Sequence, residues 1–228
     1  MLTLDVRRLS LAYKGLPYKS AWIEFPDIPS TCKKLGVAHT GLSASGEPAY
    51  TVPFIYDPNT DRHISDSAAI AKYLDETYPE TPKLFPAGTD ALQHAFTDLA
   101  WPAVGLPLYL CSMLGCLRVL NPPSQAFWRT SREARFGKPL EELATEETWA
   151  SFVAGLGKVK AVLETNGNTG GFFMGETLTF VDLQVASTLV WVKVIDGEMW
   201  DRIAGLDDGK WERYLDQFSG YISAPESA

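Results

Sequence analysis

A proline in the middle of a strand-like run is the feature that most constrains this chain. The run reads Tyr50-Thr51-Val52-Pro53-Phe54. Proline donates no hydrogen bond to a neighbouring strand and fixes its own φ, so Pro53 predicts either an ordinary edge strand or a special turn with an open backbone edge. An open edge offers the backbone groups of Val52 to a peptide-like ligand.

A second short run follows about a dozen residues later. It reads Ile64-Ser65-Asp66-Ser67-Ala68-Ala69-Ile70 and continues as a helical pattern to Leu74. An acidic residue and a serine stand where a short strand turns into a helix, so a carboxylate, a hydroxyl and backbone N–H groups converge there. Asp66 and Ser67 are predicted either as an ordinary helix cap or as a site for the charged ends of an amino acid.

In this order and spacing, the two runs resemble the glutathione site in the thioredoxin-like domain of glutathione transferases. The resemblance implies that Val52, before a cis Pro53, pairs its backbone with the cysteinyl part of glutathione. It also implies that Asp66 and Ser67 hold the γ-glutamyl end, with glutathione as the co-substrate. His39 and Lys34 are further candidates, for the glycine carboxylate, and a solvated loop side chain is the alternative for each.

The charge of the chain argues against nucleic acid as a partner. Its 228 residues carry a formal net charge of −8, whereas nucleic-acid binders gather Lys and Arg. Cys32, Cys111 and Cys116 form no C-x-x-C pair, and their odd number favours a reducing, cytoplasmic location over a disulfide framework. The three histidines have no metal-ligand spacing, so no metal site is expected.

Two stretches bear on export and on membranes. Charged residues from Asp5 to Lys14 interrupt the first twenty residues, so the apolar core of a secretory signal is not expected. The uncharged segment 99–117 has the length of a membrane span, but Pro102 and Pro107 break it. A buried helix pair that lines a pocket is predicted there, and no membrane partner.

The pattern predicts an α/β domain followed by an all-α domain. The proline-dense stretch 81–90 is predicted as a linker and 91–228 as an all-helical domain. The resemblance implies that residues 1–80 form a thioredoxin-like domain. The first domain is predicted to contain a helix over 2–14, a strand over 18–25, a short helical segment over 26–36, a polar loop over 37–49, a hairpin of 54–56 with 62–65, and a helix over 67–78.

A capping box is predicted at the start of a helix in the second domain. The Thr179 hydroxyl and the Asp182 carboxylate have the spacing to satisfy each other's backbone N–H groups, and Leu178 with Leu183 has the spacing of a hydrophobic staple. This role is structural. A T-x-x-D box at this depth is also typical of the transferase family, so the resemblance extends across both domains.

Three shorter motifs refine the resemblance; they are Tyr13-Lys14-Gly15-Leu16-Pro17-Tyr18, Cys32-Lys33-Lys34-Leu35-Gly36 and the segment from Arg132 to Glu141. They look like fungal-type transferases related to bacterial β-etherases, a group associated with wood-derived phenolics. In this family a strand and a loop with the catalytic hydroxyl or thiol precede the first helix. This sequence begins inside that helix, so we expect an incomplete first domain with its catalytic residue unknown. Thr3 is the nearest hydroxyl, with an N-cap as its alternative role.

The second domain is expected to supply a pocket for aromatic ligands. Its candidate residues are Trp101, Tyr109, Met113, Phe127 and Trp128, with Arg132 and Arg135 for acidic groups, although aromatics at helical spacing are more often core. The resemblance implies a homodimeric detoxification enzyme that conjugates or cleaves aromatic or phenolic substrates with glutathione. The alternatives are a non-catalytic ligandin-type carrier of hydrophobic aromatics and a purely structural interaction module.

Overall fold

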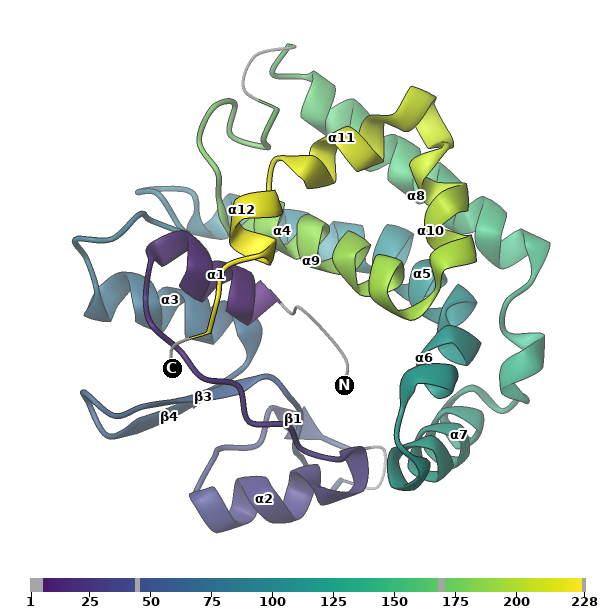
Figure 1. Ribbon diagram of the computed structural model, residues 1–228, viewed down its shortest axis with the longest axis horizontal. Helices are drawn as coiled ribbons and strands as arrows, with labels where there is room; N and C mark the ends of the chain where they lie inside the picture. Colours follow the sequence, from purple (N-terminus) through teal and green to yellow (C-terminus); the bar gives the residue numbers. More distant parts are fainter. Residues whose placement is uncertain (1–5, 44–45, 168–170, 227–228) are drawn as a thin grey trace.

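The computed structural model describes residues 6–43, 46–167 and 171–226. In these ranges a small α/β part precedes a larger helical part, as the sequence predicts (Figure 1). The small part contains α1 (Val6–Lys14), a 3₁₀ turn η1 (Phe25–Asp27), α2 (Ile28–Leu35), β1 (Gly41–Leu42), β2 (Pro48–Ala49), β3 (Phe54–Asp57), β4 (Arg62–Ser65) and α3 (Ser67–Thr77). The helical part contains α4 (Asp90–Ala100), a π-helical turn η2 (Trp101–Gly105), α5 (Leu106–Cys111), α6 (Met113–Val119), α7 (Pro122–Phe136), η3 (Leu140–Glu142), α8 (Glu146–Glu164), α9 (Phe180–Ile195), α10 (Gly197–Ala204), η4 (Leu206–Gly209), α11 (Lys210–Asp216) and α12 (Ser219–Ile222).

The predicted hairpin is present as β3 and β4, an antiparallel pair whose register places Phe54 opposite Ser65. Its turn is tied to α3 through the carboxylate of Asp57. That carboxylate accepts hydrogen bonds from the hydroxyls of Tyr73 and Tyr78, both at 2.7 Å, and from the backbone N–H of Asn59 at 2.9 Å. Burial acts to raise the pKa of Asp57, but these hydrogen bonds outweigh it and lower the pKa. The hairpin is therefore fixed against α3.

The predicted strand over 18–25 is wrong. Residues 18–24 form no regular element, and no described strand pairs with them. Their aromatic and branched side chains still pack, with Tyr18 against the α3 cluster and Ile23 beside α2. Composition supplies a strand's side chains but not the neighbouring backbone that makes a ladder. The loop predicted over 37–49 also differs, because β1 and β2 form a short ladder within it.

Helix α1 ends as predicted, with Gly15 in the left-handed region at φ 66°. Residues 1–5 lie outside the described ranges, and so does the candidate Thr3. Lys14 lies in the last turn of α1. Its side chain is buried, and Nζ lies 2.7 Å from Oδ1 of Asp75 on α3 and 3.1 Å from the carbonyl of Pro82.

The Asp75 carboxylate continues this contact into the segment that joins the two parts of the chain. It accepts the backbone N–H groups of Leu84 at 3.0 Å and Phe85 at 2.8 Å. The Leu84 carbonyl in turn accepts the backbone N–H of Phe180, the first residue of α9, at 2.9 Å, and the side-chain amide of Gln93 on α4 at 3.2 Å. One buried hydrogen-bonded chain thus links α1, α3, α4 and α9.

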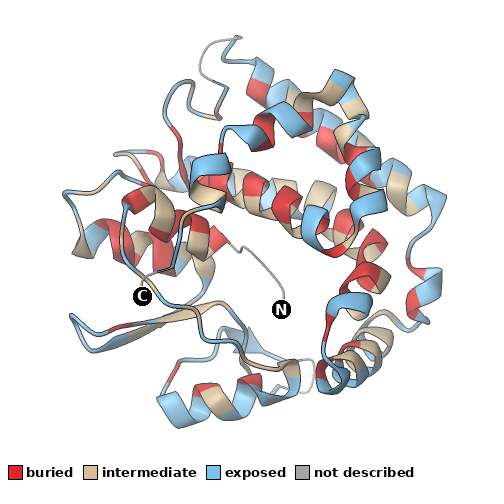
Figure 2. Cartoon of the chain, in the orientation of Figure 1, coloured by how far each residue is buried: buried red, intermediate tan, exposed pale blue. Residues whose placement is uncertain are grey.

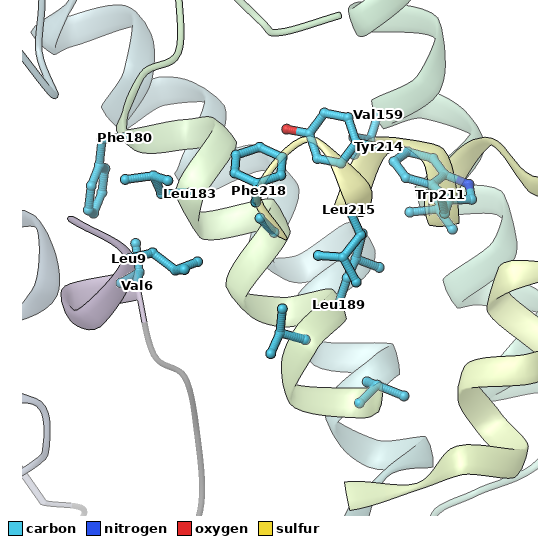
Figure 3. Close-up of a cluster of buried hydrophobic side chains, with 14 of the residues drawn as sticks. Val6, Leu9, Val159, Phe180, Leu183, Leu189, Trp211, Tyr214, Leu215 and Phe218 are labelled. Atoms are coloured by element: carbon cyan, nitrogen blue, oxygen red, sulfur yellow. The ribbon is translucent and has the colours of Figure 1, made fainter. Parts of the chain in front are cut away.

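Helix α9 runs through the middle of the helical part (Figures 1 and 2). Its buried residues face more than one side, which is typical of a helix enclosed by others. Residues from α1, α8, α11 and the turn before α12 pack around it in one core, including Leu9, Phe152, Trp211 and Phe218. Figure 3 shows Leu9, Trp211 and Phe218 of this core together with Leu183 of α9. The core therefore spans both parts of the chain, because α1 lies on α9.

A second contact between the two parts lies at η1 and α7, at the bottom of Figure 1. Glu24 accepts hydrogen bonds from the Asn121 side-chain amide at 2.6 Å and from the Ser124 hydroxyl, and these bonds, the Asn121 bond first, lower its pKa. Phe25 donates its backbone N–H to the same hydroxyl at 2.9 Å and packs on Trp128, with ring centroids 5.2 Å apart.

The segment 99–117 forms a bent succession of helices, with the π-helical turn η2 at Trp101–Gly105. Its exposure is mixed: Leu108 and Met113 are buried, whereas Leu99 is 74% exposed. No single described helix is long and apolar enough to cross a membrane. The stretch from Asp90 to Cys111 and α6 together have the length and the apolar composition of a membrane span, but the two are bent by 53° relative to each other.

We predict that the buried Lys14–Asp75 pair contributes much more stability than an exposed pair of similar geometry. Lys14→Met removes one partner of a buried pair, which typically costs about 3–5 kcal/mol in the free energy of unfolding. The matched control is Lys72→Met, because Lys72 pairs with Asp90 at 2.9 Å while both side chains are nearly half exposed. Lys72→Met is expected to lower the free energy of unfolding by about 1 kcal/mol or less. Urea unfolding followed by circular dichroism measures both, and equal losses would contradict the assignment.

Candidate functional site

The peptide bond between Val52 and Pro53 is cis, as the resemblance implies. The β3–β4 ladder begins at Phe54, so the backbone of Val52 lies outside it. The side chain of Val52 is 45% exposed, and solvent reaches this turn. The preceding Thr51 is held in place, because its hydroxyl lies 2.8 Å from that of Thr40 across the loop. The open backbone edge expected from the sequence is present.

Asp66 is the N-cap of α3, and its Oδ1 accepts the backbone N–H groups of Ala68 and Ala69, both at 3.0 Å. Its φ is 76°, a conformation that side-chain-bearing residues seldom adopt, although Asp tolerates it better than most. The second carboxylate oxygen of Asp66 and the hydroxyl of Ser67 have no hydrogen-bond partner among the described residues. Both groups stay available to a ligand at the positive end of the helix dipole.

The hairpin register brings these two motifs together. Phe54 pairs with Ser65, so the residues that precede β3 stand next to those that follow the antiparallel strand β4. Val52 and Pro53 therefore lie beside Asp66 and Ser67. An open backbone edge, a carboxylate oxygen and a hydroxyl share one surface, which suits a short peptide with a free amino-acid end.

The two candidates for the far end of such a ligand differ in their surroundings. His39 is tied to the site's edge, because the neighbouring Ala38 carbonyl accepts the Ser65 hydroxyl at 3.1 Å. Its Nδ1 lies 3.1 Å from the Gly41 carbonyl, and its ring meets Tyr50 edge-on. Lys34 is exposed on α2 and makes no hydrogen bond or ion pair with any described residue. Lys33, which sequence reasoning missed, lies over the Tyr50 ring.

The five residues expected to form an aromatic pocket do not share one cavity. Tyr109, Met113 and Trp128 belong to a core cluster between α5, α6 and α7, and the Trp128 indole N–H donates to the Met113 carbonyl at 3.3 Å. Phe127 is 38% exposed, because consecutive residues of a helix point about 100° apart. Of the five, Trp101 lines the cavity between α4, α8 and α9.

Arg132 and Arg135 were expected to bind acidic groups, but both guanidinium groups lie on aromatic rings. Arg132 stacks 4.0 Å from the Trp128 ring centroid and donates from Nε to the Tyr109 hydroxyl at 3.0 Å. Arg135 lies 5.5 Å from the ring centroid of Phe136. The stack on Trp128 lies within α7, whereas the hydrogen bond to Tyr109 joins α7 to α5.

A cavity of about 170 Å³ lies inside the helical part, bounded by α4, η2, α5, α8 and α9, with Val6 of α1 at its edge. Its walls are mostly apolar, and the polar side chains on them are Thr97, Gln184, Ser187 and Thr188. Sequence reasoning identified only Trp101 of this lining. The remaining residues come from helices far apart in the sequence, so no local pattern marks them as a group.

Two glycines shape the cavity wall at η2. Trp101 lies so closely on Gly105 that a Cβ there would meet the indole at 2.2 Å. Gly155 of α8 abuts the same turn, and a Cβ on it would lie 1.9 Å from the carbonyl oxygen of Ala103. The π-helical turn therefore packs against α8 at backbone distance.

The capping box at Thr179 and Asp182 is present at the start of α9. The fully buried Asp182 carboxylate accepts the Thr179 backbone N–H at 2.9 Å, its hydroxyl at 2.8 Å, the Phe173 backbone N–H and the Tyr214 hydroxyl. Burial raises the pKa of Asp182, and these hydrogen bonds oppose the rise. Every partner is a core group, so the box serves the fold.

The three cysteines are free and buried. Burial raises the pKa of each thiol, to about 12 for Cys116, so none of them is a nucleophile near neutral pH. In the described part of the chain, no group of three or more His, Cys, Asp or Glu side chains has the geometry to hold a metal ion.

Comparison with protein families identifies both parts of the chain. The family model of the glutathione S-transferase N-terminal domain matches residues 5–82, and that of the C-terminal domain matches residues 91–221. The chain therefore belongs to the glutathione S-transferase family. Its fold is the family's fold, a small thioredoxin-like domain followed by a large all-helical domain.

Fungal proteins are among the relatives of the chain. The chain is 32% identical over 225 residues to the glutathione S-transferase-like protein ustS of Aspergillus flavus, covering 90% of this chain and 78% of that protein. Glutathione transferase GSTFuA2 of Phanerochaete chrysosporium superposes with a TM-score of 0.93 at 46% identity, covering 96% of this chain and 90% of the other. The glutathione S-transferase CsGST63524 of Ceriporiopsis subvermispora was solved in complex with glutathione. It superposes with a TM-score of 0.91 at 37% identity, covering 97% of this chain and 91% of the other. The resemblance to fungal glutathione transferases is thereby confirmed.

We predict opposite effects for two neighbouring glycines of α8. Gly155→Ala forces the backbone of η2 away from α8, and overpacking of this kind typically costs about 1–3 kcal/mol in the free energy of unfolding. Gly157→Ala is the matched control, because its Cβ would meet nothing within 4 Å. Its better helix propensity is expected to add up to about 1 kcal/mol. Thermal unfolding of both variants tests the prediction, and two shifts in the same direction would disprove it.

Proposed function

We propose that the chain binds glutathione at the junction of Val52, Pro53, Asp66 and Ser67, and conjugates it to aromatic or phenolic acceptors. The proposal rests mainly on the hairpin register, which puts the open backbone of Val52 beside Asp66. The carboxylate oxygen of Asp66 that does not accept the backbone N–H groups of α3 is available there to a ligand. Membership of the glutathione S-transferase family supports it, as does the relative from Ceriporiopsis subvermispora that was solved with glutathione.

Each part of glutathione finds a complementary group in this arrangement. The free oxygen of Asp66 accepts the α-ammonium of the γ-glutamyl residue in a charge-assisted hydrogen bond. The Ser67 hydroxyl and the N-terminus of α3 stabilise its α-carboxylate. The backbone of Val52 pairs with the cysteinyl amide, and His39 or Lys34 contacts the glycine carboxylate.

The proposed reaction is nucleophilic attack by the glutathione thiolate on an electrophilic carbon. A carbon–sulfur bond forms, and the leaving group departs with its bonding electrons. A free thiol has a pKa near 8.5, and lowering it by about two units takes roughly 2.7 kcal/mol of preferential stabilisation of the thiolate. We assign no described residue to that role. The described site contributes binding and orientation of the nucleophile.

The alternative function, non-catalytic binding of hydrophobic aromatics, is favoured by a separate observation. The cavity between α4, η2, α8 and α9 is largely apolar and partly open to solvent, and Trp101 on its wall is 56% exposed. Such cavities bind small hydrophobic molecules whether or not chemistry follows. Binding of glutathione and binding of a hydrophobic ligand are separate measurements, so the two functions are tested independently.

We also propose that the chain works as a homodimer in the cytoplasm. The outer face of α4 carries a row of exposed apolar side chains, with Leu92 67% and Leu99 74% exposed and the exposed Ala95 between them. Residues seven apart lie on the same side of a helix, so the two leucines form one patch. The three free thiols suit a reducing compartment.

We predict that Asp66→Asn weakens glutathione binding without unfolding the protein. Asparagine keeps the helix cap and tolerates the positive φ, but it lacks the negative charge that pairs with the ammonium group. Loss of a hydrogen bond to a charged group costs about 1.5–3 kcal/mol, so the dissociation constant should rise at least about tenfold in calorimetric titrations.

The control is Asp61→Asn, at the other end of the hairpin, where an aspartate also has a positive φ of 55°. Asp61 accepts the Tyr56 hydroxyl at 3.0 Å and lies away from the junction. Its glutathione affinity should match that of the unaltered protein. An unchanged affinity in a folded Asp66→Asn variant would remove this site from consideration.

We predict that Leu99→Glu shifts the protein from dimer to monomer, because it places a charge in the apolar patch on α4. Val194→Glu is the control, since Val194 is 51% exposed on α9, outside that patch. Sedimentation velocity at several concentrations measures the oligomeric state. A dimer that survives Leu99→Glu, or a monomer in the unaltered protein, would exclude this interface.

A further inference from the structure

We infer that the cavity in the helical part selects neutral, single-ring aromatic molecules that carry a hydrogen-bond acceptor, and that the side-chain amide of Gln184 donates to that acceptor. This inference rests on the proposed binding of hydrophobic ligands in the cavity, but not on the proposed glutathione site. It assigns a specificity-determining residue to the cavity and a chemical class to its ligand.

The volume of the cavity matches about one aromatic ring. Its volume is about 170 Å³, and an engineered apolar cavity of about 150 Å³ in another protein takes up benzene. The side chains of Phe96, Val104, Leu108 and Phe152 supply apolar wall, and Trp101 offers a flat ring beside Gly105. Val6, Val159 and Leu189, drawn in Figure 3, join the cavity to the core.

The charge of the ligand follows from the lining. None of the described residues that surround the cavity has an ionisable acidic or basic side chain. A charged ligand would lose its hydration without gaining a counter-charge, and this is costly in an apolar site. The occupant is therefore neutral, and its polar atoms have to meet the few polar groups on α4 and α9.

Hydrogen bonds among these polar groups determine which of them can donate. The hydroxyls of Ser187 and Thr188 both donate to the Gln184 backbone carbonyl at 2.9 Å, so their protons are used within α9. The Thr97 hydroxyl lies 2.7 Å from Oε1 of Gln184 and 2.9 Å from the Gln93 carbonyl. With its proton on the shorter bond, Thr97 holds the Gln184 amide in one orientation.

In this orientation the Nε2 group of Gln184 has no partner among the described residues, and it provides two N–H donors at the cavity wall. The other lining side chain with a free N–H is Trp101, at the cavity's exposed end. A carbonyl or ether oxygen on an aromatic ring gains a hydrogen bond to Gln184. An unsubstituted hydrocarbon of the same shape leaves these donors unpaired.

The test compares acetophenone with ethylbenzene, which share one carbon skeleton and differ by the carbonyl oxygen. Their dissociation constants are measured by calorimetry in the absence of glutathione, for the unaltered protein and for Gln184→Met, which keeps side-chain length and removes the amide. The ratio of the two constants cancels the difference in their transfer from water. A net hydrogen bond contributes about 0.5–1.5 kcal/mol, so Gln184→Met should shift the ratio toward ethylbenzene by roughly 2- to 12-fold.

Two further variants separate the role of the amide from other causes. Thr97→Val releases the Gln184 amide from its anchor and should reduce the preference for acetophenone. Trp101→Phe keeps an aromatic ring, removes the other N–H donor and should leave the ratio unchanged. An unshifted ratio in Gln184→Met, an equal shift in Trp101→Phe, or failure of both ligands to bind the unaltered protein would overturn the inference. Circular dichroism of each variant checks its fold, and glutathione titration tests the other site separately.

Discussion

The buried carboxylate of Asp75 holds the two parts of the chain in one arrangement. It pairs with Lys14 of α1 and also accepts the backbone N–H groups of Leu84 and Phe85, where the chain enters the helical part. Buried charges are tolerated when hydrogen bonds surround them, and no buried side-chain nitrogen or oxygen of the described residues lacks a partner. The Leu84 carbonyl extends the restraint to Phe180 at the start of α9. The placement of α3, and thus of the site at its N-terminus, depends on this network.

The candidate glutathione site is built from backbone geometry more than from side chains. The β3–β4 ladder begins at Phe54 and so leaves the edge at Val52 open, and its register sets that edge beside Asp66. Asp57 ties the hairpin to α3 through Tyr73 and Tyr78, so the two halves of the site share one rigid support. Groups held by such support need little reorganisation when a ligand binds.

The cavity has a different origin, because it arises where helices fail to pack regularly. The π-helical turn between α4 and α5 displaces Trp101 onto Gly105, and Gly155 lets α8 approach the Ala103 carbonyl. Away from the cavity, the contact of Phe25 in η1 with Trp128 in α7 joins the small part of the chain to the helical part. Of the residues that the sequence analysis assigned to a pocket, Trp128 makes that contact, and Tyr109 and Met113 pack beside it in the core.

The sequence by itself determined the features that depend on neighbouring residues. Pro53 marked the special turn, Asp66 and Thr179 the helix starts, and Gly15 a helix end, because turns and caps are made by groups a few residues apart. Only the tertiary structure decided that Lys14 is buried, that residues 18–24 lack a strand partner, and that Gln184 faces a cavity. Each of these depends on segments distant in the sequence, and a ladder partner, a buried counter-charge or a cavity wall leaves no local pattern at the residue it affects.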